Sequence, residues 1–304
     1  MNFEVFILGS SSATPIYQRH PTAQVIKIHE RIFLVDCGEG TLIQMNRFKI
    51  RFHKINQIFI SHLHGDHYLG LLGLISTMHL QGRTNDLHIY CQKELKEIID
   101  IQLKYSETVL RYKIHFHFLN ATKDELIYSD DDIEVNTISL KHRIPCTGFL
   151  FKEKPRLRKL LRNKLTSYDI PVSAYEKLKN GEDFVSESGQ KISNAEVTTD
   201  PRPPRSYAFC SDTIFDERLV PILKNVDLLY HEATFMNEKE ERAKETFHST
   251  AAQAATIAVK AEAKRLIIGH FSARYKNLYP LLDEARIIYP NTTLALEGDR
   301  FTIE

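Results

Sequence analysis

The sequence predicts an α/β fold in which strands alternate with helices and several strands end in histidine or carboxylate side chains. Short apolar runs rich in β-branched residues, such as Ile55 to Ile60, indicate buried strands, and longer runs with helical spacing, such as Tyr68 to Leu80, indicate helices. The chain has 304 residues, of which 42% are hydrophobic, and this is enough for a sizeable core. Because α/β folds of this length are often one unit, we expect a single domain over residues 1–304.

The remaining elements follow from the same two patterns. The expected strands are 3–8, 25–29, 31–35, 87–91, 114–119, 133–140, 149–151, 265–268 and 293–296, with strand-then-turn segments over 207–213 and 227–235. The expected helices are 41–48, 92–105, 238–246, 251–260 and 281–288. Ser249 or Thr250 is a natural N-cap for the helix over 251–260. We expect the acidic stretch 124–134 to form a solvated face.

The densest group of chemistry-bearing residues is Ser61 to His67, which contains three histidines and one aspartate. The apolar runs on both sides indicate that it occupies a turn between a strand and a helix. His62 and His64 point the same way in an extended loop, whereas Asp66 and His67 can face a second point. Since imidazole and carboxylate are ligands of Zn²⁺ and similar ions, this spacing favours two metal sites over one.

Histidine, aspartate or glutamate residues also follow four later strands, at His142, Asp212, Glu232 and His270. If these strand ends share one edge of a sheet sandwich, they form a single site for two metal ions. The expected ligands are His62, His64 and His142 for one ion, Asp66, His67 and His270 for the other, and Asp212 as a bridge. Asp36, at the end of an early strand, either holds a ligating histidine in position or belongs to a plain turn.

Residues 152–205 interrupt the alternation of strands and helices and are too long for an ordinary connection. From Lys152 to Leu165 there are seven basic residues and one acidic residue. Such a segment either contacts phosphates or forms a solvated amphipathic helix without an electrostatic role.

The overall composition excludes few classes of function or partner. The formal net charge is +1, so the charge of the whole chain does not indicate a nucleic-acid partner. The four cysteines are scattered without a CxxC pair, which argues for small buried thiols and against a disulfide framework. We find no apolar run of about eighteen residues and no signal peptide, so we expect no membrane contact and a cytoplasmic location.

With these residues in view, the chain resembles the metallo-β-lactamase superfamily and, within it, the ribonuclease Z family of tRNA 3′-processing endonucleases. The stretches that carry the resemblance are LVDCGEGT (34–41), HLHGDH (62–67), His142, SDT (211–213), HEATF (231–235), HSTAAQA (248–254) and HFSARY (270–275). The HLHGDH signature is shared by many hydrolases, whereas HEATF and HSTAAQA are more specific. The resemblance extends from residue 3 to residue 304.

The resemblance implies a sandwich of two mixed β-sheets with helices on both outer faces. It also implies two Zn²⁺ ions per subunit, with Mn²⁺ as an accepted substitute, and a homodimer that acts on precursor tRNA. Residues 152–205 would be an inserted flexible arm that grips the tRNA. The expected substrate-binding residues are Arg274 and, in the arm, Lys154, Arg156, Arg158, Lys159 and Arg162.

For the reaction, we expect Asp66 to orient the attacking water and accept its proton, and His248 to protonate the leaving 3′ oxygen. His248 precedes a helix N-terminus, which favours an anion such as the scissile phosphate. Glu232 either orients His248 or is a purely structural carboxylate. The products would be a tRNA with a 3′-hydroxyl and a trailer with a 5′-phosphate.

Two alternatives stay open from the sequence. The same metals would serve a small-molecule phosphodiesterase or arylsulfatase, and a structural metal site would suit an RNA-binding protein without catalysis. The chain also departs from the family in the loop that senses the tRNA 3′ end, where Tyr17 and His20 replace the usual Lys and Asn.

Overall fold

The computed structural model describes residues 2–16 and 19–304, and the chain divides into two structural units. The main unit consists of the residues up to 129, 134–151 and 205–304, and the small unit consists of residues 130–133 and 152–204. Tyr17, one of the two departures from the family in the N-terminal loop, lies outside the described residues.

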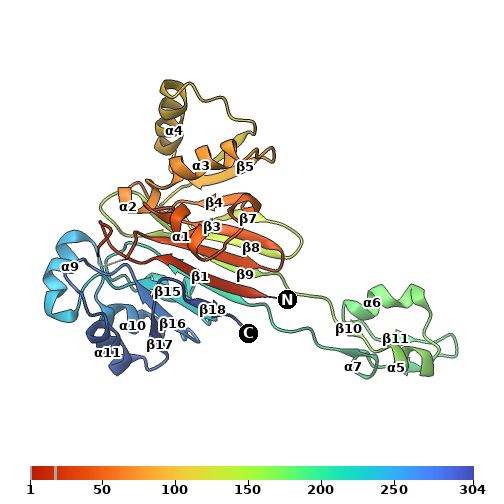
Figure 1. Cartoon of the computed structure of the whole chain (residues 1–304). Coiled ribbons are helices and arrows are strands. Elements are labelled where there is room, and N and C mark those ends of the chain that lie inside the picture. The colour runs from red at the N-terminus through yellow and green to blue at the C-terminus, as the bar shows by residue number, and fades with distance from the viewer. Residues whose placement is uncertain (1, 17–18) are drawn as a thin grey trace. The chain divides into compact units, whose positions relative to one another are not determined.

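Two seven-stranded sheets form the centre of the main unit (Figure 1). In spatial order, the first sheet contains β18 (Arg300–Thr302), β1 (Phe3–Gly9), β2 (Ala23–Ile28), β3 (Arg31–Val35), β4 (Gln57–Phe59), β5 (Leu87–Cys91) and β6 (Ile114–Phe118). The second contains β17 (Thr292–Leu294), β16 (Leu266–Gly269), β15 (Leu228–Glu232), β14 (Ser206–Cys210), β9 (Cys146–Glu153), β8 (Ile133–Leu140) and β7 (Leu126–Ser129). Both sheets are mixed, since β3 to β6 and β14 to β17 run parallel while β1–β2 and β7–β8 are antiparallel.

Helices cover the outer faces of both sheets. They are α1 (Thr41–Arg47), α2 (Gly65–Tyr68), α3 (Leu71–Leu80) and α4 (Glu94–Tyr105) beside the first sheet, and α8 (Leu219–Ile222), α9 (Glu240–Thr246), α10 (Ala251–Lys260) and α11 (Tyr279–Ile288) beside the second. Short 3₁₀ turns lie at η1 (Phe52–Lys54) and η3 (Asn237–Lys239). Among the described residues, no helix is both long and apolar enough to cross a membrane.

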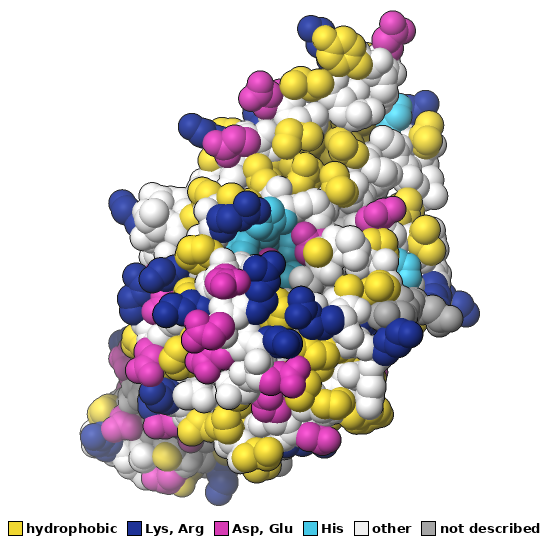
Figure 2. Space-filling view, turned by 90° about the vertical axis from the view of Figure 1, so that its left-hand side faces the viewer, with side chains coloured by type: hydrophobic (Ala, Val, Ile, Leu, Met, Phe, Trp, Pro, Cys, Tyr) yellow, Lys and Arg dark blue, Asp and Glu magenta, His cyan; other side chains and the backbone are white. Residues whose placement is uncertain are grey.

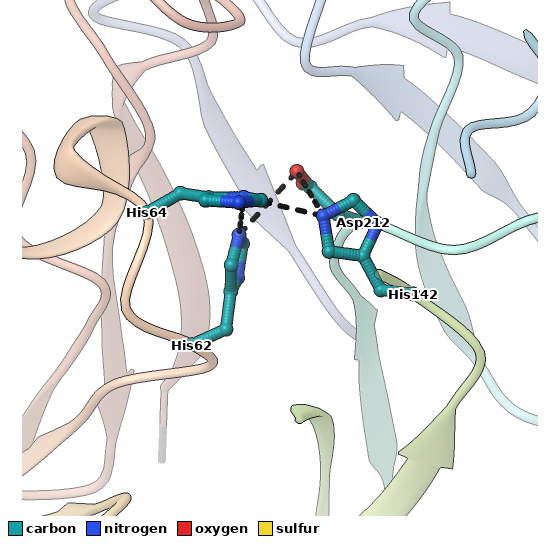
Figure 3. A group of neighbouring side chains, drawn as sticks. All are labelled: His62, His64, His142 and Asp212. Carbon is teal, nitrogen blue, oxygen red and sulfur yellow. Dashed lines mark hydrogen bonds and ion pairs between the residues drawn. The ribbon is translucent and has the colours of Figure 1, made fainter. Parts of the chain in front are cut away.

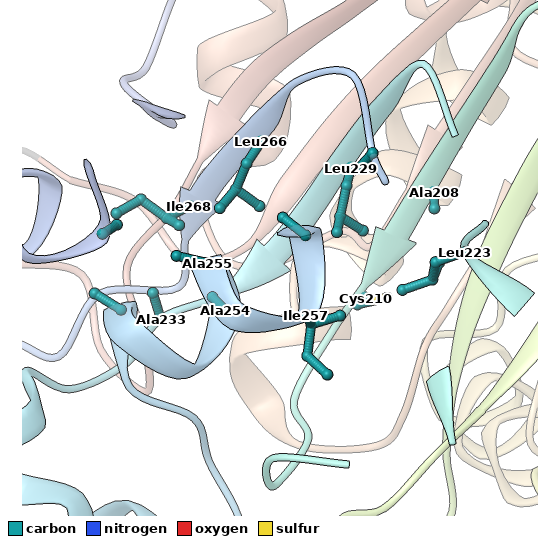
Figure 4. Packing of buried hydrophobic residues seen from close by; sticks show 14 of the residues in the cluster. Ala208, Cys210, Leu223, Leu229, Ala233, Ala254, Ala255, Ile257, Leu266 and Ile268 are labelled. Atoms are coloured by element: carbon teal, nitrogen blue, oxygen red, sulfur yellow. The ribbon is translucent and has the colours of Figure 1, made fainter. Parts of the chain in front are cut away.

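Three apolar layers hold the main unit together. Between the sheets, the Phe59 ring lies 5.3 Å from the Phe149 ring and 5.5 Å from the Phe151 ring. Beneath the first sheet, α3 and α4 bury their apolar faces in one cluster. Beneath the second sheet, the alanine-rich face of α10 packs on β15 and β16, and its small side chains allow a close approach (Figure 4). The expected αββα sandwich is therefore confirmed.

Most expected elements are present, with three corrections. The expected solvated acidic stretch contains β7, which the sequence did not indicate because this edge strand is only four residues long, partly exposed and flanked by acidic residues. The three-residue β18 was also missed, since Phe301 is its one buried residue. The expected helix over Tyr68 to Leu80 begins at Leu71 as α3, and the short helix α2 precedes it inside the expected turn.

The small unit has a hydrophobic core of its own. It contains β10 (Lys159–Leu160) paired with β13 (Thr198–Thr199), β11 (Phe184–Val185) paired with β12 (Lys191–Ile192), α5 (Arg162–Ser167), η2 (Val172–Ala174), α6 (Tyr175–Lys179) and α7 (Asn194–Val197). Its buried residues are Leu165, Ile170, Ala174, Leu178, Ile192 and Val197. Because only 162–167 of the basic stretch is helical, the expected alternative of one amphipathic helix is wrong.

All four cysteines are buried and free. Burial raises the pKa of the Cys37 thiol to about 12 and also raises the pKa of the Cys210 thiol. The expectation of small buried thiols is confirmed, and these groups stay protonated at neutral pH.

Candidate metal centre

Histidine and carboxylate side chains from four separate segments converge beyond the ends of the central strands. His62 and His64 follow β4, His142 follows β8, Asp212 follows β14 and His270 follows β16. Figure 3 shows four of these side chains pointing toward one another from different parts of the chain. The sequence therefore placed these residues correctly at strand ends, and the fold brings them together.

The first ligand group comprises His62, His64 and His142. The Nδ1 atom of His64 lies 3.0 Å from His62 Nε2 and 3.2 Å from His142 Nε2. The second ligand group comprises Asp66, His67 and His270. The Oδ2 atom of Asp66 lies 3.5 Å from His67 Nε2 and 3.4 Å from His270 Nε2. Each group matches one of the two ligand sets expected from the sequence.

The Asp212 carboxylate lies between the two ligand groups. Its Oδ2 atom is 3.5 Å from His62 Nε2 in the first group. Its Oδ1 atom is 3.4 Å from His67 Nε2 and 3.2 Å from His270 Nε2 in the second. One oxygen thus faces each group, which is the geometry that a bridging carboxylate needs.

Two buried atoms indicate that these residues fit metal ions. His67 Nε2 and Asp212 Oδ1 are buried and have no hydrogen-bond partner, although buried polar atoms are nearly always paired. Burial alone would raise the pKa of Asp212, but the imidazoles of His270, His67 and His62 hold it well below its usual range. The carboxylate is therefore ionised, and its oxygens and the imidazole nitrogens face a common centre, which is the donor set that divalent cations take.

Hydrogen bonds from Nδ1 fix the orientation of three imidazole rings. His67 Nδ1 donates to Asp36 Oδ2 at 2.7 Å, and His142 Nδ1 donates to the Phe247 carbonyl at 2.9 Å. His270 Nδ1 donates to Thr234 Oγ1 at 2.9 Å, because the Thr234 hydroxyl itself donates to Glu232. These bonds leave the Nε2 lone pairs directed at the centre. Asp36 therefore contacts a predicted ligand and is more than a plain turn residue.

Ser61 joins the two ligand groups, a contact that the sequence did not reveal. Its hydroxyl donates to Asp36 Oδ2 at 2.8 Å and accepts from His62 Nδ1 at 3.0 Å. Its backbone N–H donates to Asp36 Oδ1 at 2.7 Å. Ser61 and Asp36 thus hold His62 in the first group and His67 in the second. The position of Ser61 immediately before the HLHGDH stretch was the available signal.

Close backbone packing positions the turn that carries His62 to His67. Gly70 N donates to the Cys37 carbonyl at 2.9 Å, and Cys37 N donates to the His67 carbonyl at 2.7 Å. A Cβ atom at Gly70 would lie 2.2 Å from the Gly38 carbonyl oxygen, so this approach requires glycine. Asp36 itself has a φ of 55°, a left-handed conformation whose strain is typical of functional sites.

Partly buried His248 and buried Glu232 form a hydrogen-bonded pair beside the ligand groups. His248 Nδ1 lies 2.9 Å from Glu232 Oε1. Glu232 also accepts the backbone N–H groups of Thr213 at 3.1 Å and Thr234 at 3.0 Å. Burial would lower the pKa of His248, but the Glu232 carboxylate raises it to about 9. His248 is therefore protonated at neutral pH.

A hollow of about 530 Å³ opens above the ligand groups, and Figure 2 shows histidine side chains in it with Lys and Arg side chains nearby. The residues lining it include His64, Asp66, His142, Asp212 and His248. Arg274 is not part of the lining described. Its guanidinium lies 5.0 Å from the centre of the Phe235 ring, and that ring lies 6.2 Å from the His248 ring.

The five basic residues expected to bind substrate in the small unit differ in their surroundings. Arg158 pairs with Asp200 and donates from Nε to Thr198 Oγ1 at 2.7 Å. Arg156 Nη2 lies 3.8 Å from Glu153 Oε1. Lys159 and Arg162 are exposed, and Lys154 is half-buried.

Known proteins with similar sequences match this chain along its length. A ribonuclease Z of Bacteroides thetaiotaomicron is 49% identical over 301 residues, which cover 99% of this chain and 95% of that protein. A ribonuclease Z of Cytophaga hutchinsonii is 49% identical over 304 residues, covering 100% of this chain and 97% of that protein. The chain belongs to the ribonuclease Z family.

Solved structures agree with membership of the ribonuclease Z family. The short form of human tRNase Z has a TM-score of 0.71 and 28% sequence identity, covering 99% of each chain. The metallo-β-lactamase fold protein YhfI of Bacillus subtilis has a TM-score of 0.69 at 15% identity, and this likeness shows the fold alone. Residues 3–157 also match the profile of a family described as anti-Pycsar protein Apyc1. That region includes His62 to His67 and His142 but ends before Asp212 and His270.

Proposed function

We propose that this chain is a metal-dependent endoribonuclease that removes the 3′ trailer from precursor tRNA. It would leave a 3′-hydroxyl on the tRNA and a 5′-phosphate on the trailer. The names of the family's members and of the human structural neighbour support the substrate. The observation that carries the chemistry is the convergence of two ligand groups on either side of Asp212.

The proposed cofactor is a pair of Zn²⁺ ions in each subunit, and Mn²⁺ would accept the same nitrogen and oxygen ligands. His62, His64 and His142 would hold one ion, Asp66, His67 and His270 the other, and Asp212 would bridge them. A bound pair of divalent cations supplies Lewis acidity and lowers the pKa of water toward neutrality.

The protein's own groups would orient the reactants and move the protons. Asp66 would orient the attacking water and take its proton, and the backbone N–H of Ala13 holds this carboxylate by a 2.7 Å hydrogen bond to Oδ2. His248, which lines the hollow, would give a proton to the leaving 3′ oxygen. Glu232 would keep His248 protonated and in place, because its carboxylate accepts the Nδ1 proton.

We assign tRNA binding to the small unit and to Arg274. Lys159 and Arg162 are exposed there and would contact backbone phosphates, whereas Arg158 is paired with Asp200. We further infer a homodimer in the cytoplasm, in which the small unit of one subunit holds the tRNA that the other subunit cuts. In this proposal, the inserted arm expected over residues 152–205 would be the small unit.

The test is incubation of the purified protein with a 5′-labelled precursor tRNA, followed by mapping of the cut. We expect one cut at the 3′ side of the tRNA, which disappears on addition of a chelator and returns with Zn²⁺ or Mn²⁺. Persistent cleavage in chelator would reject metal catalysis. Hydrolysis of bis(4-nitrophenyl) phosphate without any cleavage of precursor tRNA would favour a small-molecule phosphodiesterase instead.

A further inference from the structure

Arg143 lines the hollow above the ligand groups and has no role in the function proposed so far. It follows His142 in the loop between β8 and β9, and its side chain is exposed. Its Nη2 atom lies 3.1 Å from His64 Nε2. Since a guanidinium only donates, His64 Nε2 is the acceptor in this contact.

The His64 ring separates Arg143 from the ligand groups. His64 Nδ1 faces inward, toward His62 and His142, while Nε2 faces Arg143 on the outer side. A neutral imidazole that gives its Nδ1 lone pair to an ion carries its proton on Nε2. Nε2 can then no longer accept the hydrogen bond from Arg143, and the guanidinium is available to donate to another group.

Apart from protonated His248, Arg143 is the one positive side chain among the described residues that line the hollow. Among the described residues that line it, Arg143 is the one lysine or arginine, while Glu39, Asp66, Asp212 and Glu245 are acidic. Glu245 is itself paired with Arg242 at 3.0 Å. An RNA strand entering this hollow therefore meets one permanent cation outside the ligand groups, and a guanidinium binds phosphate oxygens well.

We propose that Arg143 binds a phosphate of the RNA next to the scissile phosphate. The inference rests on the proposed function, because it requires a substrate with more than one phosphate. The guanidinium lies on the outer side of the His64 ring, away from His62 and His142, which favours a neighbouring phosphate over the scissile one. Arg143 is thus a residue that selects a polynucleotide over a substrate with a single phosphate.

The experiment compares wild type, Arg143→Ala, Arg143→Lys and the control Lys141→Ala on two substrates. Lys141 is exposed in the same loop and is not part of the hollow's lining, so the control removes the same charge elsewhere. The substrates are a labelled precursor tRNA and bis(4-nitrophenyl) phosphate, which has one phosphate. Bound zinc is measured by mass spectrometry, and KM for precursor tRNA is measured at several KCl concentrations.

For Arg143→Ala we expect KM for precursor tRNA to rise about tenfold, the loss of one charged hydrogen bond. The slope of log KM against log salt should fall by about 0.7–0.9, which corresponds to one phosphate contact. Arg143→Lys should restore most of that slope. For Arg143→Ala, activity on bis(4-nitrophenyl) phosphate and zinc content should stay within twofold of wild type. Lys141→Ala should leave the activity on both substrates unchanged.

An Arg143→Ala protein that loses zinc and both activities together would make Arg143 a structural partner of His64 and overturn the proposal. An unchanged KM and salt slope in an active enzyme would also overturn it while leaving the proposed function intact. A wild-type enzyme that does not cut precursor tRNA would overturn both.

Discussion

At the scale of single residues, the site depends on the partners of its imidazole rings as much as on the rings themselves. Asp36, Ser61 and Thr234 each bind an Nδ1 atom and leave Nε2 directed at the centre. Such partners raise the basicity of a ligand and limit its rotation. The sequence indicated the ligands because they sit at strand ends, but it did not indicate Ser61 or Thr234. Serine and threonine are common everywhere, and only the folded distances distinguish these two.

We predict that Ser61→Ala weakens metal binding by about ten- to a hundredfold, the usual effect of losing a partner of a ligating histidine. The substitution removes the acceptor of His62 Nδ1 and a donor to Asp36. Zinc affinity is measured by competition with a chromogenic chelator. Ser139→Ala is the control, since its hydroxyl donates to the Ala121 carbonyl away from the site. Equal affinity in wild type and Ser61→Ala would show that this hydroxyl does not support the ligands.

We predict that the alkaline limb of the pH–rate profile reflects His248. An acid must be protonated to act, so a pKa raised to about 9 keeps kcat high up to about pH 9 and lets it fall above that. Glu232→Gln removes the charge that raises this pKa, so the limb should move to lower pH. Glu262→Gln, which changes an exposed carboxylate paired with Lys224, should leave the profile unchanged. If Glu232→Gln lowers kcat equally at every pH, Glu232 is a structural carboxylate.

At the scale of elements, α10 is a helix whose bounds and N-cap could be predicted from the local sequence. The expected helix over 251–260 has these bounds in the structure, and Thr250 forms a capping box with Gln253. The cap lies two residues after His248 and therefore helps to fix the segment that carries it. By contrast, β7 and β18 carry too few buried residues for a strand signal. β7 pairs with the next strand, β8, whereas β18 pairs with β1 at the other end of the sequence.

We predict that Thr250→Ala lowers the free energy of unfolding by about 1 kcal/mol, the typical cost of losing an N-cap side chain. Urea unfolding followed by circular dichroism measures the change. Thr256→Ala is a matched control on the same helix, because its hydroxyl donates to the Ala252 carbonyl in the helix interior. Since alanine has the higher helix propensity, this control should be neutral or stabilising. A cost at Thr256 as large as that at Thr250 would contradict the capping argument.

At the scale of the whole molecule, the sequence predicted the sandwich and the residues that converge as candidate ligands, but not the interior of the small unit. Its buried residues, from Leu165 to Val197, are unevenly spaced, so no helix or strand period connects them. The buried Asn194 amide donates to the Leu178 and Glu182 carbonyls, each at 2.7 Å, and joins parts of the unit that are distant in sequence. Such contacts form only after folding and leave no local pattern.

We predict that the double substitution Lys159→Ala and Arg162→Ala raises KM for precursor tRNA about tenfold and leaves hydrolysis of bis(4-nitrophenyl) phosphate unchanged. Both residues are exposed in the small unit, and phosphate contacts dominate nucleic-acid affinity. Steady-state kinetics on both substrates measures the effect. Lys224→Ala, an exposed residue of the main unit, is the control. An unchanged KM would show that these basic residues of the small unit do not contribute to tRNA binding.

The central claim is that side chains from distant strand ends hold a pair of cations. Anomalous diffraction from crystals grown with Zn²⁺ tests this directly. We expect two peaks in each subunit, one among His62, His64 and His142 and one among Asp66, His67 and His270, with Asp212 between them. A single peak, or peaks away from these residues, would contradict the account.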